Sequence, residues 1–156
     1  MATALDSKLL KGAMLTGVIN AFINGGIQYF FLKEYSSIAI SVDSITNNED
    51  TVLGTSVLLS ITLAIILTMV AYFGIKEKKV DFFPTAFWLT IKHGFFTFGI
   101  LTSIAVLWQK YVGTVEVSLV SALVIIGIIA GIVSGVVNYL TLRECTLAER
   151  YKNEIH

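Results

Sequence analysis

Four stretches of the chain are long and apolar enough to cross a lipid bilayer, and polar or charged segments separate them. A membrane-spanning helix needs about 20 predominantly apolar residues. The stretches that meet this length are residues 8–32, 53–75, 88–108 and 117–142. We therefore expect an all-α protein, in which residues 1–156 form a single transmembrane domain built as a four-helix bundle.

The segments between the spans differ in length and character. Residues 34–51 form a long loop, residues 76–87 a shorter one, and residues 143–156 a tail that holds no glycine or proline to stop a helix. Ile38 and Ile40 alternate with smaller residues in the long loop. Short runs of this kind are ambiguous, and we interpret this one as an apolar anchor of a solvated loop in preference to a strand.

Basic residues predict how the spans are threaded. Lysine and arginine are enriched on the cytoplasmic side of membrane proteins. One side of the predicted membrane collects Lys8, Lys11, Lys76, Lys78, Lys79, Arg143, Arg150 and Lys152. The other side has only Lys33 and Lys110, and it also collects Glu34, Asp43, Glu49, Asp50 and Glu116. Both termini and the loop 76–87 are therefore expected in the cytoplasm, and the loop 34–51 outside.

Composition supports a membrane protein and excludes several partners. The chain is 55% hydrophobic and 14% charged, with a mean hydropathy of +0.79, whereas soluble domains are about a quarter charged. The lipid bilayer is thus the first expected partner. The net charge of zero argues against nucleic acid, which requires a basic face. The single cysteine, Cys145, and the lack of a Cys/His cluster indicate no metal and no cofactor.

The sequence also suggests a membrane of residence. The first apolar run is longer than a signal-peptide core, and the chain holds no Asn-x-Ser/Thr glycosylation motif. Together with the short loops, these features favour the inner membrane of a bacterium.

The first span carries the most distinctive polar pattern of the chain. Asn20, Asn24 and Gln28 lie in the middle and second half of an uncharged apolar stretch, and on a helix they fall within one arc of about 80°. An amide that faces hydrocarbon costs several kcal/mol. Two interpretations remain open: the amides hydrogen-bond to other helices and fix the packing, or they line a path for an ion or small polar solute.

The fourth span offers a close-packing surface. Gly127, Gly131 and Gly135 share one arc with Ser134 and Asn138. Small residues at this spacing are typical of helix packing, within one chain or across a dimer. The opposite face is expected to point towards lipid and holds Ile125, Ile129, Val133 and Val136.

His93 is the one histidine inside a predicted span, about five residues beyond Trp88. Its ordinary pKa near 6.5 would suit proton sensing. A hydrogen-bonded histidine near the membrane boundary is the plainer interpretation.

Similar segments close the second and fourth spans. YFGIKE at residues 72–77 and YLTLRE at residues 139–144 match by residue class at nearly every position. Two helical hairpins with the same threading would be related by an axis along the membrane normal. The chain is therefore a candidate for two tandem helical hairpins.

These features favour transport over catalysis. The chain holds no nucleophile, metalloprotease or phosphate-loop motif, so we expect no enzyme. Four short helices enclose little space, and we therefore expect a homo-oligomer that acts as a channel or facilitative transporter. Its path would use Asn20, Asn24, Gln28 and Asn138, with His93 near the inner mouth. The alternative is a structural or accessory subunit that packs against a membrane-protein partner.

Overall fold

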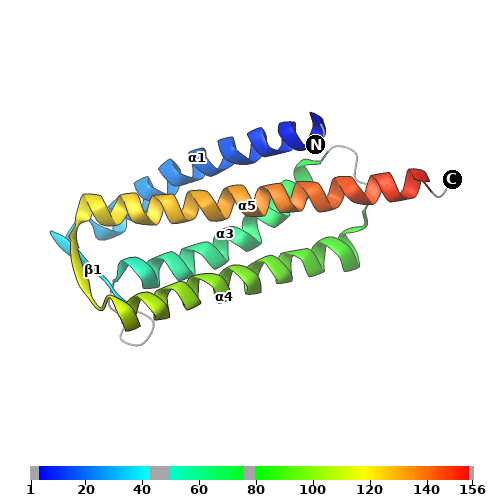
Figure 1. The fold of residues 1–156 in the computed structure, drawn as a ribbon. Coiled ribbons are helices and arrows are strands. Elements are labelled where there is room, and N and C mark those ends of the chain that lie inside the picture. Colours follow the sequence, from blue (N-terminus) through cyan, green and yellow to red (C-terminus); the bar gives the residue numbers. More distant parts are fainter. Residues whose placement is uncertain (1–3, 43–49, 76–79, 155–156) are drawn as a thin grey trace.

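The computed structural model describes residues 4–42, 50–75 and 80–154, and this part of the chain is helical almost throughout (Figure 1). The long helices are α1 (Ala4–Leu32), α3 (Val52–Gly74), α4 (Phe87–Tyr111) and α5 (Leu119–Glu154). A short π-helix, η1 (Phe82–Ala86), leads into α4. Asp43, Glu49, Lys76, Lys78 and Lys79, on which the predicted threading partly rests, lie outside the described residues.

Four helices are long and apolar enough to cross a membrane, as the hydrophobic pattern predicts. Their apolar segments are Leu9–Leu32, Val52–Gly74, Phe82–Tyr111 and Leu119–Cys145. The fourth begins two residues later than expected, because Val117 and Ser118 belong to a strand. Helix α5 continues to Glu154, in agreement with the missing stop signal in the tail.

A two-stranded sheet covers one end of the helices, so the solvated loop predicted around Ile38 is wrong. Strand β1 (Ser37–Ile40) pairs antiparallel with β2 (Val115–Ser118), with Ile38 opposite Val117. The partner strand follows α4, far along the chain, so the local sequence of β1 gives no sign of it. An apolar cluster lies beneath the sheet and consists of Leu32, Ile38, Ile40, Val52, Leu53, Ala105, Ala122 and Ile126.

The four helices form a row in the order α1, α5, α3, α4 (Figure 1). Within the described residues, the backbone of α1 comes close to α5 and not to α3 or α4, so α1 forms one edge of the row. The row is symmetric in the chain order of its members: exchanging α1 with α4 and α3 with α5 gives the same row read from its other end. Each half of the described chain has the element order helix, strand, helix, and the two strands pair with each other.

Helix α5 lies inside the row and is covered on two sides. Val133 packs with Leu63 and Ala64 of α3 in a second apolar cluster, so its expected position towards lipid is wrong. Ile125 and Ile129 are half-buried, and only Val136 of the four residues assigned to the lipid face is largely exposed. The stripe of α5 that remains uncovered consists of Val120, Val124, Ile128, Ile132 and Val136.

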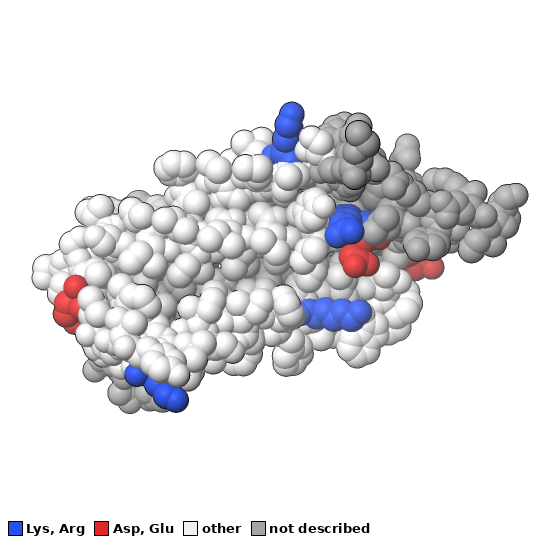
Figure 2. Space-filling view, viewed as in Figure 1, with Lys and Arg blue, Asp and Glu red and all other residues white. Residues whose placement is uncertain are grey.

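Charged side chains fall into two sets along the molecule. In Figure 2, a red and a blue group appear at the left end of the face shown, and the other charged side chains lie from its centre towards the right, with an uncharged stretch between the two sets. The N- and C-terminal ends of the described chain lie at the same end (Figure 1). This distribution suits a protein whose uncharged stretch lies in hydrocarbon.

Candidate functional site

Helix α1 approaches α5 backbone to backbone through glycines of both helices. A methyl group at Gly17 would lie 2.7 Å from the Gly131 carbonyl oxygen, and one at Gly131 would lie 2.9 Å from the Gly17 oxygen. Methyl groups at Gly127 and Gly135 would lie 3.0 and 3.2 Å from carbonyl oxygens of α1. The glycines of the fourth span therefore face α1 of the same chain, where any side chain would force the two helices apart.

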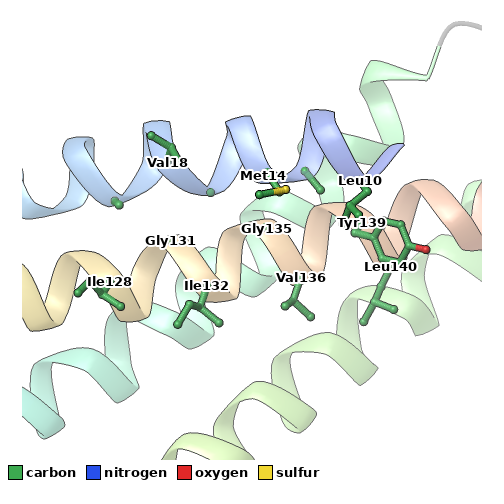
Figure 3. A pocket seen from close by; sticks show the side chains of 13 residues that line it. Leu10, Met14, Val18, Ile128, Gly131, Ile132, Gly135, Val136, Tyr139 and Leu140 are labelled. Carbon is green, nitrogen blue, oxygen red and sulfur yellow. The ribbon is translucent and has the colours of Figure 1, made fainter. Parts of the chain in front are cut away.

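One flank of the α1–α5 interface is apolar. A groove of about 470 Å³ runs along it between Met14 and Val18 of α1 and Ile128, Ile132 and Val136 of α5 (Figure 3). These side chains belong to the largely exposed apolar surface of the molecule. Such a groove suits lipid acyl chains, which fill apolar surface without hydrogen bonds.

The other flank is polar. Asn138 of α5 donates a hydrogen bond from Nδ2 to the Thr16 hydroxyl of α1 over 3.1 Å. On α1 itself, the Asn20 Nδ2 donates to the Thr16 carbonyl oxygen at 2.9 Å and the Asn24 Nδ2 to the Asn20 carbonyl oxygen at 2.8 Å. Of the two ends of a side-chain amide, only the NH2 group can donate to a backbone carbonyl, so these bonds fix which end of each amide faces its own helix.

Ser134 adds a buried hydroxyl to the same flank. Asn20 follows Thr16 by one helical turn, and Ser134 precedes Asn138 by one turn on a helix that runs the opposite way (Figure 1). Since Thr16 and Asn138 are bonded, the helical repeat places Ser134 at the level of Asn20. Ser134 is 0% exposed, and its Oγ has no hydrogen-bond partner among the described residues. We call Thr16, Asn20, Asn24, Gln28, Ser134 and Asn138 the polar flank.

Gln28 lies in a crevice between α1 and α3 at the end covered by the sheet. The crevice has a volume of about 400 Å³, and its polar lining is Gln28, Asp50, Thr55 and Thr62. Its apolar walls come from Phe31 and Leu32 of α1 and from Leu58 and Leu59 of α3. The polar flank thus opens into a mixed polar and apolar cavity at this end.

Asp50 lies exposed at this crevice and accepts a hydrogen bond from Tyr35. The Tyr35 hydroxyl lies 3.0 Å from Asp50 Oδ2. This bond, reinforced by the negative charge of Asp50, raises the pKa of the Tyr35 hydroxyl above its ordinary value, because ionisation would break the bond and place two negative charges together. Within the described part of the chain, no lysine or arginine forms an ion pair with Asp50.

His93 belongs to a different interface. Its Nδ1 lies 2.9 Å from the Thr68 hydroxyl oxygen, and the side chain is 8% exposed between α4 and α3. Thr68 donates its one hydroxyl proton to the Ala64 carbonyl oxygen, so Nδ1 of His93 must carry the proton that joins the two side chains. The structure therefore brings Asn20, Asn24, Gln28 and Asn138 along one flank and places His93 away from it, on a helix that does not contact α1.

Sequence reasoning missed the hydroxyl groups of α3. Ser56, Ser60 and Thr68 are 2%, 0% and 0% exposed, and their spacing of four and eight residues places them on one face of the helix. That spacing is visible in the sequence and was a usable signal. Thr62 and Asp50 were also missed as crevice residues, because nothing in the sequence shows that α1 and α3 flank a common cavity.

Neither a metal site nor a similarity to known proteins assigns a function to this chain. Among the described residues, no group of three or more His, Cys, Asp or Glu side chains is arranged to hold a metal ion. No protein-family model, no curated protein and no solved structure matches this chain. Any function must therefore be argued from the polar flank and its crevice.

Proposed function

We propose that the protein is an oligomeric channel or facilitative transporter whose path follows the polar flank. From Thr16 to Gln28 the flank extends over twelve residues of α1, or about 18 Å, which is more than half of a hydrocarbon core of about 30 Å. The Gln28 crevice prolongs it at one end, and Asn138 lies near the other. A row of hydrogen-bonding groups of this length offers a solute successive partners in place of water.

The observation that supports this proposal is that the polar flank is only partly covered within one chain: Asn24 and Ser134 are 6% and 0% exposed, whereas Asn20 and Gln28 are half-buried. Within the described residues, the backbone of α1 comes close to that of α5 and not to that of α3. No third helix backbone therefore lies against the half-buried Asn20 and Gln28. Because polar groups are costly in hydrocarbon, a second copy of the chain is expected to lie over the flank and enclose the path between the two copies.

A path through the middle of one copy is disfavoured, because a packed apolar cluster lies beneath the sheet at one end of the helices. Ile38, Ile40 and Val52 are at most 7% exposed there and close the space between the helices with apolar side chains. A hydrated route would have to displace this packed cluster. The space between copies is the better candidate.

Passive movement is more consistent with the residues than coupled transport. The apolar spans contain no aspartate or glutamate except Glu144, which is next to the last residue of the fourth span. Coupling to a proton or cation normally uses an ionisable group near the middle of the membrane. We therefore propose downhill flux.

The test is flux through purified protein in liposomes with the variant Asn24→Leu, which removes one amide and keeps the side-chain size. Phe22→Leu is the matched control, because Phe22 lies on the same helix and is 79% exposed. We expect Asn24→Leu to reduce flux of a permeant solute at least tenfold and Phe22→Leu to leave it unchanged. Equal flux in all three proteins, or no flux in any folded protein, would contradict the proposal.

The second candidate is a structural or accessory subunit that uses the same flank to pack against another membrane protein. It is favoured by the bonds of Asn20 and Asn24 to their own helix, since an amide satisfied in this way needs no solute. The same variants separate the two functions. Loss of assembly in Asn24→Leu, together with absence of flux in the wild-type protein, would support the accessory subunit.

We also propose that both termini lie in the cytoplasm of a bacterial cell. This orientation is supported by the basic residues that flank the first and fourth spans on the side of the two termini, since lysine and arginine are enriched on the cytoplasmic side. Reporter fusions at the two termini and after Lys33 would test it. The proposal requires the two termini to report one side and the fusion after Lys33 the other.

A further inference from the structure

We infer that the Gln28–Asp50 crevice binds a small primary alkylammonium ion, which would be the substrate class of the proposed path. This inference rests on the proposed function for its role in transport, but the binding itself is a separate property. It is carried by the charge of the crevice, by the direction of its hydrogen bonds and by the nature of its walls.

Asp50 supplies the charge. Its carboxylate has the Tyr35 hydroxyl as a neutral partner, and no cation of the described residues compensates it. A carboxylate can accept several hydrogen bonds at once, so a second donor fits beside Tyr35. An ammonium ion satisfies both requirements, because it brings a positive charge and three N–H donors.

The neighbouring polar groups favour a ligand that donates hydrogen bonds. Thr62 lines the crevice and donates its hydroxyl proton to the Leu58 carbonyl oxygen at 3.0 Å. Its oxygen can then only accept. Outside the crevice, further along the polar flank, the amide nitrogens of Asn20 and Asn24 are bonded to their own helix. Their side-chain carbonyl oxygens therefore remain for other donors along the path.

The walls select an amine with an apolar part. Phe31, Leu58 and Leu59 line the crevice together with Gln28 and Asp50. The alkyl chain would lie against the leucines, and Phe31 adds an aromatic ring of the kind that attracts a nearby cation. An anion would meet Asp50 with like charge, and a neutral alcohol would lack the charge that Asp50 pairs with.

Binding is tested with n-butylammonium chloride as the probe, and with n-butanol and sodium butyrate as ligands of the same chain length. Isothermal titration on the full chain in detergent compares wild type with Asp50→Asn. Glu116→Gln is the matched control, because Glu116 is an exposed carboxylate of β2 in the same sheet-covered region and lies outside the crevice. We expect butylammonium alone to bind, and to bind about fivefold more weakly to Asp50→Asn, as for an exposed ion pair.

The outcomes separate the ligand from the function. Binding that Asp50→Asn weakens and Glu116→Gln leaves unchanged supports the inference, even if liposomes show no amine flux, in which case only the proposed function fails. Equal binding of butanol, equal loss in Glu116→Gln, or no binding to folded protein would overturn the inference. Flux of neutral solutes without amine binding would retain the path and reject its substrate class.

Discussion

Helices α1 and α4 hold equivalent places at the two edges of the row, yet they attach to the inner helices in different ways. Helix α1 meets α5 through glycines and carbonyl oxygens, with Gly17 against Gly131. Helix α4 meets α3 through side chains, where His93 pairs with Thr68 and Gly94 faces Ile65. The same arrangement is therefore held once by backbone proximity and once by interlocking side chains.

The difference determines where each edge helix places its polar groups. On α4 the polar side chains lie within the interface, where His93 and Thr97 are 8% and 9% exposed. On α1 the interface consists largely of Ala13, Gly17 and Ala21, so the amides lie on its flank. Polar residues of α4 thus serve packing. On α1, Asn24 is just as buried at 6% exposed, whereas Asn20 and Gln28 are half-buried.

Gly17→Ala should break the α1 side of this comparison with the largest effect. The new methyl group would lie 2.7 Å from the Gly131 carbonyl oxygen, and we expect a loss of about 3 kcal/mol from such overpacking against backbone. Reversible unfolding in mixed detergent–SDS micelles measures it. Gly26→Ala on the same helix meets nothing within 4 Å and should leave stability unchanged or raise it by up to about 1 kcal/mol. Equal destabilisation by the two variants would refute the close approach.

Thr68→Val should break the α4 side with a smaller effect. The variant keeps the side-chain shape and leaves the buried Nδ1–H of His93 without its acceptor, which costs about 2 kcal/mol. Thr62→Val is the control, since Thr62 is exposed and bonds only to its own helix; we expect a change within about 0.5 kcal/mol. The same unfolding assay serves, and a neutral Thr68→Val would show that the histidine bond contributes nothing.

Asn138→Leu should have a still smaller effect, because glycine contacts hold α1 and α5 together without it. Hydrogen bonds between membrane helices average about 0.6 kcal/mol, and the bond from Asn138 to Thr16 is expected to lie in that range. A double-mutant cycle with Thr16→Val isolates the pair. A coupling energy indistinguishable from zero would remove this bond from the account.

Tyr35→Phe should have the smallest effect on stability and is best followed by titration. The raised pKa of Tyr35 means that its bond to Asp50 stabilises the fold below the ordinary tyrosine pKa and is lost as pH rises through the raised value. The tyrosinate absorbance of wild type minus that of Tyr35→Phe follows this one hydroxyl. In Asp50→Asn its pKa should fall towards the ordinary range; an unchanged pKa would show that Asp50 is not its partner.

The helices could be predicted well from the sequence because the apolar composition of each span reflects its position in the membrane. An uncharged run such as that of α3 is apolar on nearly all sides, and neither its length nor its type depends on its neighbours. The glycine spacing of α5 likewise indicated a surface for close approach. Gly131 now lies against Gly17 of α1, a partner that the spacing alone did not name.

Features that depend on distant partners were harder to predict. Strand β1 is four residues long and exists through its pairing with β2, which no local pattern of Ile38 and Ile40 specifies. Val133 was assigned to lipid because a helix with one small-residue face was expected to have one covered side, whereas α5 has two. Predicting the Gln28–Asp50 crevice would have required knowing that α1 and α3 line a common cavity, and the hydrophobic pattern does not give the order of the helices.

The most direct test of the central claim is whether water reaches the polar flank of α1 in the assembled protein. In a Cys145→Ser background, single cysteines at Asn20 and Gln28 are compared with cysteines at Phe22 and Phe30, which are 79% and 72% exposed on the same helix. A charged, membrane-impermeant thiol reagent is applied to protein in liposomes. The account predicts labelling at positions 20 and 28 and none at 22 and 30. Protection of all four positions would mean that the polar flank is dry packing, and the proposed path would have to be abandoned.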